Sequence, residues 1–324
     1  MITPFNLSLS NIGLSTGVRL VEVERSGVVE SVHNGHLVVL DTAGQPVFQL
    51  GEPAQPIFAR SSLKPLQAVG MLRAGLELEP AELALAGASH SGSALHRELV
   101  SAMLTGAGLT EDDLDCPPDL PAGIAERRDY LAAGLAESRL AMNCSGKHAA
   151  MLLTCLANGW PVSGYLAREH PLQLALAGTV AELAEEPIAA VGVDGCGAPL
   201  FGVSLLGLAR AFHQLATGTG PQRQVAEAMR GYPELVGGID RPVTSLMRAV
   251  PGLIAKDGAE GVYAAALPDG GTVALKIDDG ASRAADCAVA WALHHLGVRL
   301  PALAEIPVLG GGRPVGVIRP AAGW

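Results

Sequence analysis

Residues 60–67 read Arg60-Ser61-Ser62-Leu63-Lys64-Pro65-Leu66-Gln67, where a helix is expected to begin. Side chains at positions i and i+3 share one face of a helix, so Ser61 and Lys64 would lie close together. A neutral lysine amine in this position can accept the proton of a serine hydroxyl and make the serine oxygen a nucleophile. The stretch therefore predicts a Ser–Lys pair for acyl transfer at the start of a helical region. The alternative is a helix-capping serine followed by an ordinary cation.

Lysine is rare in this chain, because only Lys64, Lys147, Lys256 and Lys276 occur among its 22 basic side chains. Three of them sit among small or apolar residues, whereas Lys256, followed by Asp257 and Gly258, is predicted to lie in a turn. Arginine keeps its proton in proteins, but a desolvated lysine can lose it. A cation in the first turn of a helix also opposes the helix dipole, which disfavours a purely structural role for Lys64.

The composition is that of a soluble enzyme, with 49% hydrophobic and 17% charged residues in a chain of 324. The formal net charge of −10 and the absence of a basic run argue against nucleic acid and anionic membranes as partners. The N-terminus carries no signal-peptide pattern and no long apolar run follows, so a cytoplasmic location and no membrane span are expected. Five widely spaced cysteines indicate reduced thiols instead of a disulfide framework.

Hydrophobic periodicity predicts an α+β fold. Residues 17–50 alternate with period two and contain Asn34-Gly35, a strong hairpin signal, so an antiparallel meander is expected there. A strand at 188–194 and a hairpin over 262–277 are also expected. The expected helices are 64–75, 80–86, 94–106, 146–159, 171–186, about 200–216, 221–230 and 281–296. The prediction is a single catalytic unit over residues 1–324, in which a sheet from both chain ends (about 17–60 and 255–324) brackets a helical middle (about 61–254).

Other chemistry-bearing residues are less specific when taken alone. Ser89 lies in a Gly-flanked polar loop that is otherwise typical of a helix cap, and Lys276 ends a strand, where an amine is often solvated. The spacing of Cys144, Lys147, His148 and Cys196 contains no Cys-x-x-Cys pair and does not by itself predict a metal site. Three polar residues bordering Asn34-Gly35 are expected to serve the hairpin: Glu30, His33 and His36.

Six segments together resemble the serine-dependent L-asparaginases of the Rhizobium type, the asparaginase II family. They occur in the family's order and cover residues 20 to about 295. The segments are Arg25-Ser26-Gly27 to Gly35, Arg60 to Gln67, Ala88-Ser89-His90-Ser91-Gly92, Asn143-Cys144-Ser145-Gly146-Lys147-His148, Asp194-Gly195-Cys196-Gly197 and Lys276-Ile277-Asp278-Asp279-Gly280.

The resemblance implies a serine β-lactamase and glutaminase-like fold, a homodimer, and hydrolysis of L-asparagine to L-aspartate and ammonia. It implies Ser61, Lys64, Ser89 and Lys276 as two catalytic Ser–Lys pairs. It also implies a zinc ion held by Cys144, Lys147 and Cys196, in a positional or structural role. The substrate-binding candidates are His90, His148, Asp194 and Arg241.

The implied mechanism is attack of Ser61 on the side-chain amide with Lys64 as the base, through an acyl-enzyme. One departure from the family lies at Gly238 to Thr244, where relatives carry a Gly-Thr-Gly-Arg-x-Asp-Thr-like segment. Arg241 and Thr244 keep their places but their neighbours differ, which leaves the preference between asparagine and glutamine open. The alternatives are a glutaminase, a β-lactamase-like serine acyl transferase and, from another class, a non-catalytic zinc-stabilised binding domain.

Overall fold

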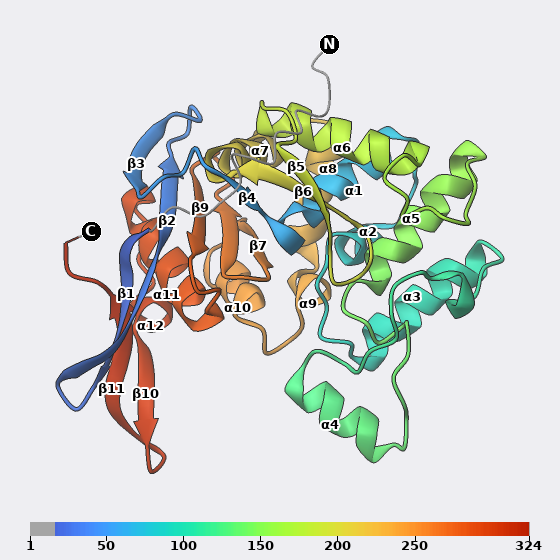
Figure 1. Cartoon of the computed structure of the whole chain (residues 1–324). Coiled ribbons are helices and arrows are strands. Elements are labelled where there is room, and N and C mark those ends of the chain that lie inside the picture. Colours follow the sequence, from blue (N-terminus) through green and yellow to red (C-terminus); the bar gives the residue numbers. More distant parts are fainter. Residues whose placement is uncertain (1–16, 324) are drawn as a thin grey trace.

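The computed structural model describes residues 17–323 and combines an antiparallel sheet with a large helical region (Figure 1). The strands of the main sheet run in the order β10-β11-β1-β2-β9-β8-β7, and β3 pairs with β2 outside this path. Strands from the two ends of the described chain are neighbours, because β1 pairs with β11 and β2 pairs with β9. The expected α+β arrangement, with a sheet from both chain ends around a helical middle, is therefore present.

The N-terminal strands differ from the expected meander at one position. The strands are β1 (Val18–Arg25), β2 (Val28–Leu40) and β3 (Pro46–Leu50). The predicted turn at Asn34-Gly35 is wrong, because β2 passes straight through it. Gly35 serves a close approach between strands instead, since a Cβ atom there would lie 2.2 Å from the carbonyl oxygen of Lys276.

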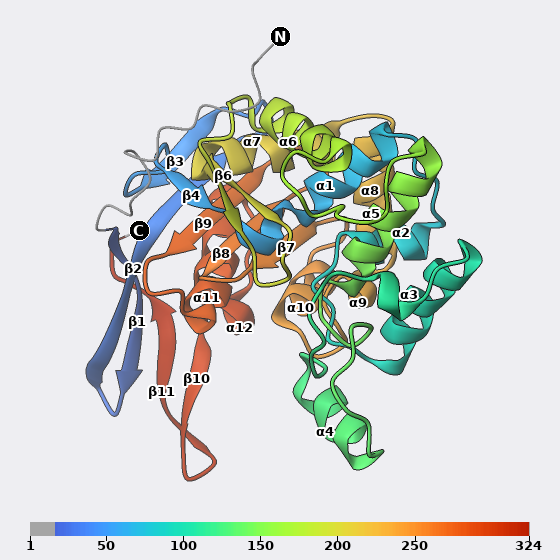
Figure 2. The same ribbon diagram turned by 45° about the vertical axis from the view of Figure 1, so that its right-hand side comes forward.

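The C-terminal part of the sheet contains three strands more than the sequence pattern predicted. The strands are β7 (Ile254–Gly258), β8 (Val262–Ala266), β9 (Thr272–Ile277), β10 (Ile306–Gly310) and β11 (Arg313–Pro320). The hairpin over 262–277 is confirmed. The prediction that Lys256 lies in a turn is wrong, because this residue is fully buried in β7. The hairpins β1/β2 and β10/β11 project together from the body of the protein (Figure 2).

Two helices cover the sheet. The helix α7 (Leu205–Thr217) packs on β2, β8 and β9, and α11 (Ser282–Ala292) packs on β1, β8, β9 and β11. The helix α7 begins at Ser204, whose Oγ accepts a hydrogen bond of 2.9 Å from the backbone N–H of Gly207, an N-cap arrangement. The predicted helix at about 200–216 is right from residue 205 onward, but its first residues form a strand. The predicted helix at 281–296 is α11 followed by η4 (Leu293–Leu296).

Most of the remaining helices form the helical region beside the main sheet, whereas α12 packs on α11 and β11 (Figure 1). The remaining helices are α1 (Lys64–Arg73), α2 (Pro80–Ala86), α3 (Ala94–Gly106), η3 (Glu111–Asp113), α4 (Ile124–Ala132), α5 (Ser145–Asn158), α6 (Pro171–Ala184), α8 (Pro221–Gly231), α9 (Pro233–Val236), α10 (Pro242–Ala249) and α12 (Pro301–Ala304). Gly159 ends α5 in the left-handed conformation, with φ of 65°, as the Gly-terminated pattern predicted. None of the helices between residues 17 and 323 is long and apolar enough to cross a membrane.

A second, small sheet connects the helical region to the predicted nucleophile. It has the order β4-β6-β5, with β4 (Pro56–Phe58), β5 (Ala190–Val193) and β6 (Pro199–Ser204). The strand β4 leads directly into the 3₁₀ helix η2 (Arg60–Leu63), and η2 packs against the edge strand β7 of the main sheet. Ser61 therefore lies where the two sheets and the helical region meet.

Candidate active site

Ser61 and Lys64 lie one turn apart where η2 continues into α1, and Pro65 occupies the first turn of that helix. The backbone N–H of Lys64 donates to the carbonyl oxygen of Ser61. Ser61 is partly exposed, and its hydroxyl makes no hydrogen bond within residues 17–323. Arg60, the residue before it, has the unusual φ of 53°. The predicted nucleophile is thus accessible and unengaged at a strained turn.

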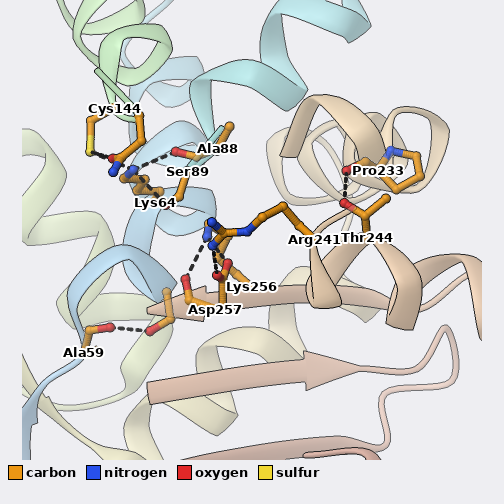
Figure 3. Close-up of polar contacts among 12 residues, drawn as sticks. Ala59, Lys64, Ala88, Ser89, Cys144, Pro233, Arg241, Thr244, Lys256 and Asp257 are labelled. Carbon is orange, nitrogen blue, oxygen red and sulfur yellow. Dashed lines mark hydrogen bonds and ion pairs between the residues drawn. The ribbon is translucent and has the colours of Figure 1, made fainter. Parts of the chain in front are cut away.

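The Lys64 amine is 1% exposed and contacts three acceptors other than Ser61. Its Nζ lies 2.7 Å from the carbonyl oxygen of Ala88, 3.0 Å from Ser89 Oγ and 2.9 Å from Cys144 Sγ (Figure 3). No hydrogen bond joins Lys64 to the Ser61 hydroxyl among the described contacts. The structure therefore brings together three of the predicted site residues, Lys64, Ser89 and Cys144, around one buried amine.

Ser89 is held in place by its backbone, because its N–H donates to the carbonyl oxygen of Val236 at 3.0 Å. His90, the next residue, points into the interior and is fully buried. Its Nε2 lies 2.9 Å from Ser145 Oγ, and its ring stacks on His96. Burial, with a smaller contribution from His96, lowers the pKa of His90 well below its ordinary value. His90 is a neutral core residue beneath the loop.

Lys276, the second predicted catalytic amine, bonds elsewhere. Its Nζ lies 2.6 Å from each of two carbonyl oxygens, those of Glu260 and Ile277. It lines a cavity of about 230 Å³ together with Arg60 and Asp278. Burial lowers its pKa. In the described part of the chain, Lys276 makes no hydrogen bond to Ser61 or Ser89, so the second predicted Ser–Lys pair is not formed.

Lys256 is the amine that the sequence reasoning missed. It lies in the edge strand β7 against which η2 packs, and a Cβ atom on Gly258, two residues along, would lie 2.8 Å from the carbonyl oxygen of Ala59. Burial lowers the pKa of Lys256 to about 8; the charge of Asp257 opposes this shift, and the charge of the nearby Lys64 adds to it. Strand order, not sequence spacing, gives Lys256 this position.

Asp257 connects Lys256 to Arg241. Lys256 Nζ donates to Asp257 Oδ1 at 2.6 Å, and Arg241 Nη2 donates to Asp257 Oδ2 at 3.0 Å (Figure 3). Burial alone would raise the pKa of Asp257, but the charges of Lys256 and Arg241 hold it below its ordinary value. Arg241, predicted to bind substrate, therefore acts on Lys256 through a shared carboxylate in this structure.

The predicted metal ligands form a buried cluster next to Lys64. Cys144 and Cys196 are 4% and 1% exposed, and Lys147 Nζ lies 3.3 Å from Cys196 Sγ. A hydrogen bond between the two thiols, and then burial, raise the pKa of Cys144, whereas the same bond lowers that of Cys196. Burial works to lower the pKa of Lys147, but the charges of Cys196 and Cys144 outweigh it and raise that pKa.

The donor chemistry of this cluster fits a thiophilic cation only if the amine takes part. No group of three His, Cys, Asp or Glu side chains that could hold a metal ion occurs among residues 17–323. Two thiols and the Lys147 nitrogen are nevertheless adjacent, and His148 Nε2 is buried without a hydrogen-bond partner. Sulfur and nitrogen donors of this kind suit zinc. His148 itself is oriented by Tyr165, whose hydroxyl lies 2.7 Å from Nδ1.

Asp194 forms an ion pair with Arg60, the residue that precedes the predicted nucleophile Ser61. Arg60 Nε donates to Asp194 Oδ1 at 2.9 Å, and the backbone N–H of Gly195 donates to the same oxygen. Arg60 Nη1 also lies 3.8 Å from Glu260 Oε1. This ion pair ties the loop that contains Cys196 to the residue preceding Ser61.

A family model described as L-asparaginase II matches residues 21–320 of the chain. The chain belongs to the L-asparaginase II family. No curated protein matches the chain significantly. Membership in the L-asparaginase II family implies L-asparaginase activity, an amide hydrolysis whose substrate is a small molecule. The buried Lys64, the adjacent hydroxyls and the accessible Ser61 are the groups in this L-asparaginase that offer such chemistry.

Proposed function

We propose that this chain hydrolyses L-asparagine through an acyl-enzyme formed on Ser61. The observation that carries the proposal is the buried Lys64 amine, which lies one helical turn from Ser61 and 3.0 Å from Ser89 Oγ. Ser61 and Ser89 are both partly exposed, but Ser89 Oγ contacts Lys64 whereas the Ser61 hydroxyl makes no hydrogen bond among the described residues, so Ser61 is the hydroxyl that is free to attack a substrate amide. The serine nucleophile makes a metal-activated water unnecessary for the first step.

In the first half-reaction, Ser61 Oγ attacks the side-chain carbonyl carbon of asparagine and its proton passes to the Lys64 amine. The tetrahedral intermediate then loses ammonia, and the proton that the leaving nitrogen needs returns through the Ser89 hydroxyl, which contacts Lys64. The product is an aspartyl ester of Ser61. In the second half-reaction, water attacks this ester and gives its proton to the neutral Lys256 amine, which lies in the strand packed against the Ser61-bearing η2; the proton then passes to Ser61 Oγ as aspartate leaves.

Lys256 replaces Lys276 as the second amine in this proposal. Two neighbouring ammonium groups disfavour each other, so the positive charge on one amine favours the neutral form of the other. A pKa of about 8 gives Lys256 a substantial neutral fraction near neutral pH, and Asp257 with Arg241 fixes its position. Lys276, bound to two carbonyl oxygens, would support the β7–β8 turn instead.

Cys144, Lys147 and Cys196 are proposed as the ligands of a zinc ion. When bound, zinc supplies a Lewis acid that can fix the α-amino or α-carboxylate end of the substrate. Asp194 and Arg60 would contribute to the same end of the pocket, because they lie between the Cys196 loop and Ser61. His148, which is held by its hydrogen bond with Tyr165, would help to orient the thiol cluster.

The resemblance supports two further proposals, a serine β-lactamase and glutaminase-like fold and a homodimer. The packing of the Ser61-bearing η2 on an edge strand that carries Lys256 supports the first. The free and buried state of all five cysteines supports a reducing, cytoplasmic location. The mass in solution, measured by light scattering, tests the dimer.

The experiment that tests the proposed function is ammonia release from asparagine and from glutamine by the wild-type chain, Ser61→Ala and Ser62→Ala. Ser62 is the matched control, because its hydroxyl is buried and donates to the carbonyl oxygen of Ala59. We expect Ser61→Ala to lose at least about 1000-fold in kcat, a typical cost of removing a nucleophile. Equal activity in the two variants would refute the proposal. The ratio of the two substrates answers the preference that the sequence left open.

A further inference from the structure

A cavity of about 550 Å³ lies between the segment before α4, the start of α10 and the helix α11. Its charged lining residues are Glu126, Arg128, Asp240, Arg241, Asp257 and Asp286. Ser61, Lys64, Ser89 and the thiol cluster are absent from its lining. The cavity lies on the α11 side of the sheet, where the directly paired Asp257 and Tyr263 face Asp286.

A second cavity of about 260 Å³ adjoins the first. Asp240, Pro242, Tyr263 and Asp286 line both cavities, so these residues mark where the two meet. The rest of the smaller cavity is mostly apolar. Its apolar lining residues are Leu246, Val289, Ala290, Ala302, Leu303 and Ile306. A charged compartment is thus continuous with an apolar one.

Two carboxylates of the larger cavity, those of Asp240 and Asp286, have no cationic partner among the described residues, and Asp286 is the one that is partly buried, since Asp240 is exposed to solvent. Asp257 is already paired with Lys256 and Arg241, and Glu126 accepts a hydrogen bond of 2.7 Å from Ser91 Oγ. Asp286 is partly buried and makes no hydrogen bond or ion pair among the described residues. Burial and the charge of Asp257 raise the pKa of Asp286 to about 7, as expected for a carboxylate without a partner.

Tyr263 provides an independent polar group at the same place. It is 1% exposed, and its hydroxyl makes no hydrogen bond with residues 17–323. Burial, and then the charges of Asp257 and Asp286, raise its pKa, so the hydroxyl lies near both carboxylates. Tyr263 lines both cavities, and its hydroxyl is not among the fully buried polar atoms without a partner, so this hydroxyl opens onto the cavity, where a ligand can bond to it.

We propose that the two cavities form one binding site for a small organic cation, a primary amine or guanidinium joined to an apolar group. The cationic head lies against Asp286, where it balances the unpaired carboxylate and contacts the Tyr263 hydroxyl. The apolar group occupies the smaller cavity between α10, α11 and α12. Because Asp257 borders the site and also holds Lys256, a bound cation acts on the electrostatics of the catalytic amine.

Isothermal titration calorimetry of the full-length protein with three probes of similar shape tests the charge requirement. The probes are benzylamine, benzyl alcohol and benzoate. We expect benzylamine to bind at least about tenfold more tightly than either other probe, since a charge-assisted hydrogen bond in a partly buried site has this effect. Equal or weaker binding of benzylamine would overturn the proposal.

Substitutions in the cavity lining test where benzylamine binds. Asp286→Asn should weaken benzylamine binding about tenfold or more, whereas Asp112→Asn, at an exposed carboxylate that lines neither cavity, should not. Ser282 is exposed and lines the larger cavity, so changes there preserve folding. Ser282→Lys should weaken binding through repulsion more than Ser282→Gln, which has similar length without charge. Identical benzylamine affinities for Ser282→Lys and Ser282→Gln, or for Asp286→Asn and wild type, would contradict the proposal that the cation binds in this cavity against Asp286.

Discussion

Lys64 Nζ lies 3.0 Å from Ser89 Oγ, although these residues come from different segments of the helical region. This bond joins the helix that follows Ser61 to the polar loop after α2. The same amine also reaches Cys144 at 2.9 Å, so one buried lysine connects the proposed nucleophile, the proton relay and the thiol cluster. The catalytic proposal depends on this arrangement.

Lysine substitutions distinguish the two candidates for the second amine. Lys256→Arg keeps a cation beside Asp257 but cannot supply a free amine, so we expect kcat to fall at least about 100-fold, the scale of general acid–base catalysis. Lys276→Arg should keep kcat within about tenfold, because Lys276 bonds only to carbonyl oxygens among the described contacts. Steady-state ammonia release checks both variants. A larger loss for Lys276→Arg than for Lys256→Arg would restore the pairing predicted from sequence.

The pH profile should follow the Lys256 amine. Its pKa is lowered to about 8, so its neutral form is the minor species below pH 8 and dominates above it. We therefore expect kcat for asparagine to fall about tenfold per pH unit below 8 and to level off above it, since the neutral amine takes the proton of the water that attacks the ester. A profile that is flat between pH 6 and 9 would contradict a titrating base of this kind.

Zinc content tests the thiol cluster directly. Elemental analysis of the purified chain should find about one zinc ion per chain, as expected for a single tetrahedral site. Cys196→Ser should lose the metal, whereas Cys155→Ser, at a buried cysteine in the body of α5, should keep it. Equal metal content in both variants would exclude Cys196 as a ligand.

Two glycines give opposite predictions for stability. Gly35→Ala should lower the free energy of unfolding by about 3 kcal/mol, because its Cβ would meet the carbonyl oxygen of Lys276 in the paired strand. Gly178 lies in α6, where an added Cβ atom would meet nothing within 4 Å, so Gly178→Ala should raise that free energy by about 1 kcal/mol. Urea unfolding measures both. If the two substitutions changed the free energy of unfolding similarly, the close approach of β2 and β9 would not be the reason for a glycine at position 35.

Sequence patterns predicted most of the longer helices, many of which carry Pro near the first residue or Gly after the last, but they missed the short helices α9, α10 and α12, although each begins with Pro. They failed where tertiary contacts decide. Asn34-Gly35 has turn chemistry, yet β2 continues because β1 and β9 pair with it on both sides. The motif 256–258 also resembles a turn, and only the order of the strands puts Lys256 at the edge next to η2.

The candidate site likewise has a part that local sequence spacing predicted and a part that depends on tertiary contacts. Local spacing was sufficient to single out Ser61 and Lys64, because one helical turn joins them. The contact of Lys64 with Ser89 and Cys144 depends on packing between distant segments, which spacing alone does not encode. Lys276 kept its predicted strand but not its predicted partner, because its amine turns toward the β7–β8 connection.

The most direct test of the central proposal is mass spectrometry of the chain quenched during turnover of L-asparagine. The proposal predicts an aspartyl ester on the peptide that contains Ser61, which persists in Ser62→Ala and is absent in Ser61→Ala. An ester on Ser89, or full asparaginase activity in Ser61→Ala, would contradict it.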